Sequence, residues 1–243
     1  MNDNRWKMMM VMLIMMLITA CTNTSKQSNN SERPPQEKIV TMATGVQEKG
    51  RHYPEVSDLL TDTGHIIYAE LSGLRYELGD EGAIYTVGTW KVLENLKGDL
   101  DEGTSVEVSK DGGYATIQAW IDSFKDADMK EALKEEALTM ISEEELKAYY
   151  TGNFSQGDMD SMVGDRSILF LKKGGSALFE NAQSRLGGPE GEFAETEGGH
   201  FFKLGQLSVK DNRLVCEGAT ELPKGESLPT FYSLDEIKAM IAE

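Results

Sequence analysis

The sequence predicts an α+β domain of mainly antiparallel strands, folded as a small OB-like barrel with an inserted helical segment and a C-terminal helix. Three observations predict this class. Runs rich in Val, Ile, Tyr and Thr, separated by Gly- and Asp-rich turns, fill residues 66–109 and return at 167–172. Residues 120–150 carry Ala, Leu, Glu and Lys at helical spacing. A helix-start signal at residues 232–237 precedes the last apolar residues of the chain.

The first half of the domain predicts three successive strands. Residues 66–78 form the first, and the Ser72-Gly73 pair interrupts its apolar pattern in the manner of a bulge. Residues 83–93 and 104–109 form the second and third strands, because each is rich in β-branched and aromatic residues and is bounded by turn residues. The expected arrangement is a meander.

The insertion at about 120–150 predicts two helices. Ser142 and Glu145 have the spacing of a capping box, so one helix should end near Met140 and another should begin at Glu143. Core packing against the barrel is the favoured role of the large side chains here, and a surface for a partner is the alternative. These side chains are Met129, Leu133, Leu138, Met140, Tyr149 and Tyr150.

The second half begins with an expected loop at residues 151–164. The apolar run 167–172 then predicts a strand that is covered on both faces, and the inserted helices are one candidate cover. Residues 201–209 and 213–216 flank a Lys-Asp-Asn turn and predict a hairpin. We therefore expect five or six strands in all.

The C-terminal helix has a complete start signal. Ser233 is the expected N-cap, Glu236 closes the capping box, and Tyr232 with Ile237 has the spacing of a hydrophobic staple.

Several short motifs resemble known families. Residues 84–98, with Val106 and Val108, are similar to the strand–Lys-Gly–strand core of netrin-like domains. Residues 66–241 resemble a lipoprotein family of Gram-positive (Firmicutes-type) bacteria through Tyr-x-Val, Leu-Lys-Gly-Asp, Gly-Gly-Tyr, Leu-Phe-Leu and Tyr-Ser-Leu-Asp-Glu-Ile. The resemblance implies a β domain and supplies no catalytic residue.

The N-terminus predicts a secretion signal. Arg5 and Lys7 precede about thirteen uncharged residues, which is the length of a signal-peptide core and less than the roughly twenty residues of a membrane span. Residues 17–21 resemble the lipobox of bacterial lipoproteins, which implies lipidation of Cys21. An ordinary secretory signal with a chance cysteine, or a buried helix, is the alternative.

The predicted organisation has three parts. Residues 1–20 are the signal peptide, 21–52 are a lipid-anchored tether, and 53–243 are one globular domain. The tether assignment rests on the polar, Pro-containing composition of the chain after Cys21. The expected location is the extracytoplasmic face of the cell membrane, where the acylated cysteine enters the lipid bilayer.

Charge and cysteine content exclude several classes of function. The formal net charge is −17, and removal of the leader, which carries +1, leaves −18. Binding to nucleic acid or to anionic lipid is therefore not expected. With Cys21 lipidated, Cys216 has no partner for an intrachain disulfide.

No familiar catalytic motif is present, so no catalytic residue is assigned. His52, His65 and His200 stand outside the His-Glu-x-x-His pattern, and no nucleophile elbow or phosphate loop occurs.

Gly112, Gly113 and Tyr114 are the candidate ligand-binding residues. Two glycines can expose backbone N–H groups, and a tyrosine offers a flat contact face. A turn between a strand and the insertion explains the same residues.

Asp158, Asp160 and Asp165 are the candidate metal ligands. Ca²⁺ prefers several carboxylate and carbonyl oxygens, and no other cofactor is expected. The cluster does not complete a twelve-residue calcium loop, so solvated loop carboxylates are the alternative.

These observations predict a non-catalytic lipoprotein that binds an envelope protein, peptide or ligand. A cell-envelope hydrolase is the alternative function, and it needs two carboxylates roughly 5–9.5 Å apart, one with a raised pKa. A structural subunit of a membrane assembly is a third hypothesis.

Overall fold

The computed structural model describes residues 33–40, 52–53, 55–155, 157–205 and 230–242. The predicted signal peptide, Cys21, Cys216 and the hairpin turn at 210–212 lie outside these residues. Within the described part of the chain, no helix is long and apolar enough to cross a membrane.

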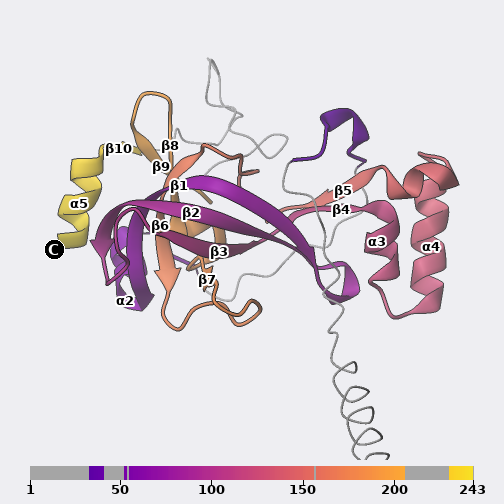
Figure 1. Ribbon diagram of the computed structural model, residues 1–243, viewed down its shortest axis with the longest axis horizontal. Coiled ribbons are helices and arrows are strands. Elements are labelled where there is room, and N and C mark those ends of the chain that lie inside the picture. The colour runs from indigo at the N-terminus through magenta and orange to yellow at the C-terminus, as the bar shows by residue number, and fades with distance from the viewer. Residues whose placement is uncertain (1–32, 41–51, 54, 156, 206–229, 243) are drawn as a thin grey trace, which may run out of the picture.

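The fold is α+β with mostly antiparallel strands, which confirms the predicted class (Figure 1). Eight strands form one sheet in the order β10-β9-β8-β6-β1-β2-β3-β7, and β4 and β5 form a two-stranded sheet. The strands are β1 (Thr63–Leu78), β2 (Ile84–Lys97), β3 (Ser105–Asp111), β4 (Gly113–Thr116), β5 (Tyr150–Asn153), β6 (Arg166–Lys172), β7 (Gln183–Ser184), β8 (Glu192–Glu195), β9 (Phe201–Lys203) and β10 (Phe231–Tyr232).

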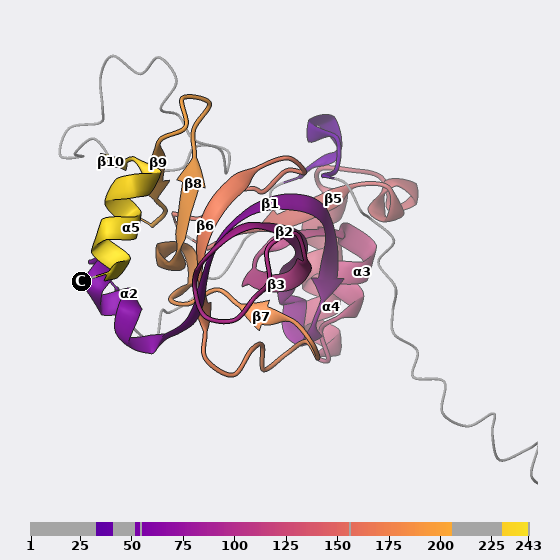
Figure 2. The same ribbon diagram turned by 60° about the vertical axis from the view of Figure 1, so that its left-hand side comes forward.

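The predicted OB-like closure is not formed, because the large sheet stays open. Strands β1, β2 and β3 curl strongly (Figure 2), and β7 pairs with β3 over only two residues. A single bridge between Leu171 and Arg185 then links the end of β7 to β6. One bridge is not a ladder, so the sheet rolls up without becoming a barrel.

The predicted meander is confirmed. β1 pairs with β2 and β2 with β3, both antiparallel. The register of β1 against β2 shifts between Leu71 and Gly73, which is where the Ser72-Gly73 pair predicts a bulge. Such shifts increase local twist, and this long strand has three of them, so the bulges help the sheet to curl.

Strand β6 is covered on both faces, as predicted, but not by the inserted helices. Ile168 and Phe170 face a core shared with α2 (Val56–Asp62) and α5 (Leu234–Ala242). Leu169 packs on the opposite face, inside the rolled sheet. Alternate residues of a strand point to opposite faces, so one apolar run serves two cores.

The insertion forms a separate lobe, here called the helical arm (residues 117–147). It contains α3 (Ile117–Asp122), α4 (Ala127–Leu138) and a 3₁₀ turn (Glu143–Lys147). The capping box of Ser142 and Glu145 is confirmed, although it starts this short turn and not a full second helix. The arm packs in a core that it shares with Ile84 of β2 and Ala115 of β4, and it lies at the opposite end of the molecule from α2 and α5 (Figure 1).

The large side chains of the insertion divide into two groups. Leu133, Tyr149 and Tyr150 pack against neighbouring cores. The other three are exposed by 41–48% of their surface: Met129, Leu138 and Met140. The first group fits the predicted role in core packing, and the second group is exposed, as a surface for a partner requires.

The C-terminal helix α5 begins where the sequence places it. The backbone N–H of Ser233 donates to Glu236 Oε2 at 2.6 Å, and the N–H of Glu236 donates back to the Ser233 hydroxyl at 3.2 Å. Tyr232 and Ile237 pack in the same core, as a hydrophobic staple requires.

The sheets have more strands than the five or six expected. The additional ones have two to four residues, among them β5, which lies in the expected loop 151–164. Segments so short carry no alternation that a sequence pattern can reveal.

Candidate functional site

The candidate site is a buried acidic loop (residues 157–161) between the rolled sheet and the N-terminal segment. It carries two of the predicted metal ligands, Asp158 and Asp160, and each is only 1% exposed. Burial of a carboxylate is costly unless it is paired. The partners of the two side chains therefore decide what the loop can do.

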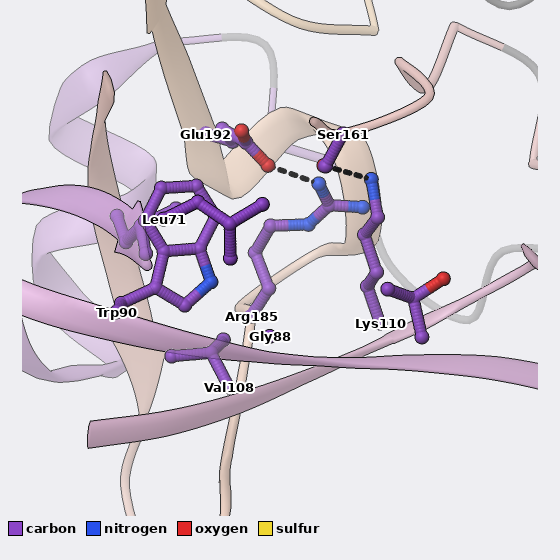
Figure 3. A pocket seen from close by; sticks show the side chains of 10 residues that line it. Leu71, Gly88, Trp90, Val108, Lys110, Ser161, Arg185 and Glu192 are labelled. Atoms are coloured by element: carbon purple, nitrogen blue, oxygen red, sulfur yellow. Dashed lines mark hydrogen bonds and ion pairs between the residues drawn. The ribbon is translucent and has the colours of Figure 1, made fainter. Parts of the chain in front are cut away.

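Asp158 belongs to a four-membered charge cluster, and Figure 3 shows its other three members, Lys110, Arg185 and Glu192. Its two carboxylate oxygens accept hydrogen bonds from both terminal nitrogens of Arg185, and the Nη1–Oδ1 distance is 3.1 Å. Arg185 also donates to Glu192, and Lys110 Nζ lies 3.6 Å from Asp158. The formal charges of these four buried groups sum to zero.

The electrostatics keep Asp158 ionised. Burial opposes its ionisation, but the charges of Arg185 and Lys110 outweigh burial and lower the pKa of Asp158. Likewise, burial opposes the charge of Arg185, yet Asp158 and Glu192 raise its pKa. An ionised carboxylate held by a guanidinium has no proton to donate and is a weak base, so Asp158 in this state is poorly suited to general acid–base chemistry.

The cluster borders a small, partly open pocket. Apolar side chains of the curled strands form its other walls, including Leu71, Trp90 and Val108 (Figure 3). The cavity leaves about 10 Å³ for the centre of a water-sized sphere, which is the space of about one water molecule. No small-molecule substrate fits in that volume.

Asp160 points away from this cluster. Its Oδ2 accepts hydrogen bonds from the Tyr114 hydroxyl at 2.7 Å and from Arg33 Nε at 2.5 Å. The Tyr114 ring stacks edge-on against Tyr76 and Phe154 and is 4% exposed. Burial, followed by the hydrogen bond to Asp160, raises the pKa of Tyr114.

The ligand-binding candidates therefore form a packed junction. Gly112 and Gly113 carry the chain from β3 into β4, with φ of +92° and +142°. A Cβ on Gly113 would lie 2.6 Å from Tyr76 Cδ1, so glycine is required for close approach. The structure brings Tyr114 and Asp160 together, a contact that the sequence did not predict.

Asp165 is separate from the other two predicted metal ligands. Its carboxylate accepts a hydrogen bond from the Met162 N–H at 2.6 Å, which closes the turn before β6. Among the described residues, no three His, Cys, Asp or Glu side chains are grouped as metal ligands would be.

The three histidines have different surroundings. His52 Nδ1 lies 2.5 Å from the buried Glu190, and His65 Nδ1 lies 3.4 Å from Asp99. His200 is in the turn between β8 and β9, where its N–H donates to the Thr196 hydroxyl.

The sequence reasoning missed Arg185, Lys110 and Glu192. Arg185 follows a two-residue strand, and its partner Asp158 is 27 residues away along the chain. No local pattern links residues so far apart, and a charged side chain is normally taken as solvated. Only the rolled sheet brings them together.

The fold and site thus define an acidic α+β protein whose interior charges neutralise one another. Comparison of the chain with protein-family models, curated proteins and solved structures finds no match.

The Gly112 turn gives a testable prediction. Alanine at Gly112 would place Cβ 2.5 Å from the Asn153 carbonyl oxygen at a positive φ, so Gly112→Ala should cost about 3 kcal/mol of unfolding free energy. Gly103→Ala is the matched control, because φ is +81° and no atom lies within 4 Å of the new Cβ. It should cost about 1 kcal/mol. Urea unfolding measures both, and equal losses would contradict the proposed clash.

Tyrosine titration gives a second prediction. Burial, and then the hydrogen bond to Glu195, raise the pKa of Tyr68 to about 12. The raised pKa stabilises the folded state at pH values below the ordinary tyrosine pKa of about 10. This stabilisation is lost as the pH rises through about 12. Absorbance near 295 nm should therefore show a step near pH 12 that Tyr68→Phe removes. A complete titration of all tyrosines near pH 10 in the folded protein would contradict this result.

Proposed function

We propose that this chain is a membrane-anchored extracytoplasmic lipoprotein that binds an envelope protein and performs no chemistry. The observation that carries the proposal is the self-neutralised charge cluster around Arg185, beside which the pocket has room for about one water molecule. A pocket of this size does not hold a small-molecule ligand, which favours a role for the surface of the described residues. The lipobox-like residues 17–21 and the resemblance to Gram-positive lipoproteins support the membrane location.

The helical arm is the proposed contact surface. Met129, Leu138 and Met140 are large, apolar and exposed, and they belong to the lobe that projects from the sheet (Figure 1). Flexible Met side chains adapt to a partner surface, and exposed apolar groups are common at protein contacts. Within the arm, α4 packs on α3 with Ala137 fully buried, so the exposed side chains stand on a held scaffold.

Site-specific cross-linking in intact cells tests this function. A photoreactive residue at Leu138 should capture a defined protein, whereas the same residue at Leu178, which is 62% exposed and lies outside the arm, should not. Cys21→Ala should abolish the capture, because the unanchored protein leaves the membrane. Met140→Glu should weaken it about tenfold or more, as a contact residue would.

Failure to capture a protein at the arm would favour the alternative function, a cell-envelope hydrolase. Burial raises the pKa of Asp111, whereas the pKa of Asp158 is lowered, so the two pKa values are shifted in opposite directions. Such divergence is what an acid–base pair of carboxylates requires. If no position on the arm captures a protein, Asp111→Asn is the first variant to assay against envelope polymers.

A further inference from the structure

Residues 33–40 form a strap that is fastened to the domain at both ends. At one end, Arg33 Nε donates to Asp160 Oδ2 at 2.5 Å, and Arg33 Nη2 donates to Gln36 at 2.8 Å. At the other end, Ile39 bridges Tyr150 of β5, and the Val40 N–H donates to the Tyr150 carbonyl at 2.8 Å. The strap lies beside β5 in both views (Figures 1 and 2).

The Arg33 end is the stronger attachment. Asp160 is 1% exposed, while the Arg33 side chain is 25% exposed. Loss of Arg33 would leave Asp160 buried and still ionisable, with a hydrogen bond from the Tyr114 hydroxyl but without its cation. Ile39 adds apolar contact with the core of the rolled sheet, and Val40 adds contact with the core of the arm. The strap is therefore held by a buried ion pair and by both neighbouring cores.

The strap shortens the reach of the predicted anchor. From Cys21 to Arg33 the chain makes twelve Cα–Cα steps, which span at most about 40 Å. Without the strap, the first described contact after it would be His52, 31 steps from Cys21, and the reach would be about 105 Å. The attachment point also moves, from the Glu190 region to the β5 end of the molecule.

We propose that the strap holds the helical arm at the membrane, so that the arm is the membrane-proximal part of the protein and its partner is a protein of the same membrane. This inference rests on the proposed function, because it requires lipid at Cys21. β5 pairs with β4, which leads directly into α3 of the arm. Helices α2 and α5 lie at the other end of the molecule (Figure 1), so this orientation would place them farther from the bilayer.

Charge indicates a protein partner in preference to lipid head groups. Residues 126–147 of the arm carry eight acidic and three basic side chains, a net charge of −5. Anionic head groups would repel this surface, whereas basic loops of a membrane protein would attract it. The exposed Met129 and Met140 then supply apolar contacts within an acidic surface.

Energy transfer to a labelled bilayer tests the orientation. The full lipidated chain carries Cys216→Ser, so that one introduced cysteine takes the donor dye, either Glu135→Cys on α4 or Ala239→Cys on α5, both exposed positions. The acceptor is a dye-labelled lipid in phosphatidylcholine vesicles. Transfer from position 135 should exceed transfer from position 239 at least twofold.

Two variants separate the strap from the fold. Arg33→Ala should bring the transfer ratio towards one, while Arg166→Ala, which removes an exposed arginine paired with Glu70, should leave it unchanged. Because Arg33→Ala also disturbs a buried pair, the second variant inserts twenty Gly and Ser residues between positions 21 and 33. That insertion leaves every described contact intact, extends the reach to about 110 Å, and should lower the ratio in the same way.

The possible outcomes separate a failure of the strap proposal from a failure of the proposed lipoprotein function. Mass spectrometry without a lipid adduct at Cys21 would overturn both, before any transfer is measured. A lipidated protein with equal transfer from positions 135 and 239, or with a ratio that the insertion does not change, would overturn the strap alone. A marked rise in transfer from position 135 when phosphatidylserine is added would show direct lipid binding, which would overturn the choice of a protein partner.

Discussion

Replacement of Arg185 by alanine is expected to unfold the protein or to cost about 3–5 kcal/mol of unfolding free energy. Arg185 is the cation that faces both Asp158 and Glu192, and the side chains of all three are at most 3% exposed. Without it, two buried carboxylates remain, and among the described residues Lys110 still faces Asp158 but forms no ion pair with Glu192. Urea unfolding followed by circular dichroism measures the change.

The matched control is Arg166→Ala. Arg166 pairs with Glu70 at 2.8 Å, but its side chain is 50% exposed, so water replaces the lost partner and the cost should stay below about 1 kcal/mol. A loss for Arg185→Ala as small as this would show that the cluster is hydrated and that the interior is open to solvent.

The same cluster sets the acid stability. The pKa of Asp158 is lowered in the folded state. Its contribution to the unfolding free energy is therefore fully present at pH values above the ordinary aspartate pKa of about 4. The contribution is lost as pH falls below that value through the lower folded pKa. The unfolding free energy of the wild type should therefore fall more steeply below pH 4 than that of Asp158→Asn. Parallel pH profiles would contradict this assignment.

Replacement of Phe193 by alanine should cost about 3–5 kcal/mol, because it opens a cavity in the core between the sheet and the two helices α2 and α5. Phe193 is fully buried, and its ring centre lies 5.7 Å from that of Phe170 and 5.9 Å from that of Tyr232. Thermal or urea unfolding measures the loss. Phe193→Leu, which keeps most of the volume, should cost less than about 1.5 kcal/mol.

Phe231 provides the control for Phe193. It stands on β10, near the same part of the sheet, and its ring is paired with Phe202 at 6.2 Å. It is 44% exposed, so Phe231→Ala should cost about 1 kcal/mol or less. Similar losses at positions 193 and 231 would mean that α5 and β10 do not cover this core.

The parts of the fold that the sequence predicted correctly depend on local patterns. The Ser72-Gly73 interruption marks a bulge in β1, and the Ser233–Glu236 capping box marks the start of α5. Each involves residues within a few positions of one another, where propensity and hydrogen bonding act directly. The capping box at Ser142 is present for the same reason, even though a 3₁₀ turn follows it.

The parts that the sequence did not predict depend on contacts between distant residues. Barrel closure requires a ladder between β7 and β6, and one bridge at Leu171 and Arg185 stands there instead. The cover of β6 comes from α2 and α5, which lie before and after it in the chain, and not from the insertion between β4 and β5. Hydrophobic alternation shows that a face is buried, but does not say which element buries it.

The candidate site shows the same division. Gly112 and Gly113 were predicted to bind a ligand, with a turn as the alternative, and the structure shows why glycine stands there: Tyr76 and the Asn153 carbonyl approach the backbone closely. The sequence by itself determined the α+β class, the meander, the helix starts and the acidic charge, because these follow from composition and from neighbours along the chain. Only the tertiary structure decided that Asp158 and Asp160 have cations as partners, since Arg185 and Arg33 reach them across 27 and 127 residues through the rolled sheet and the docked strap.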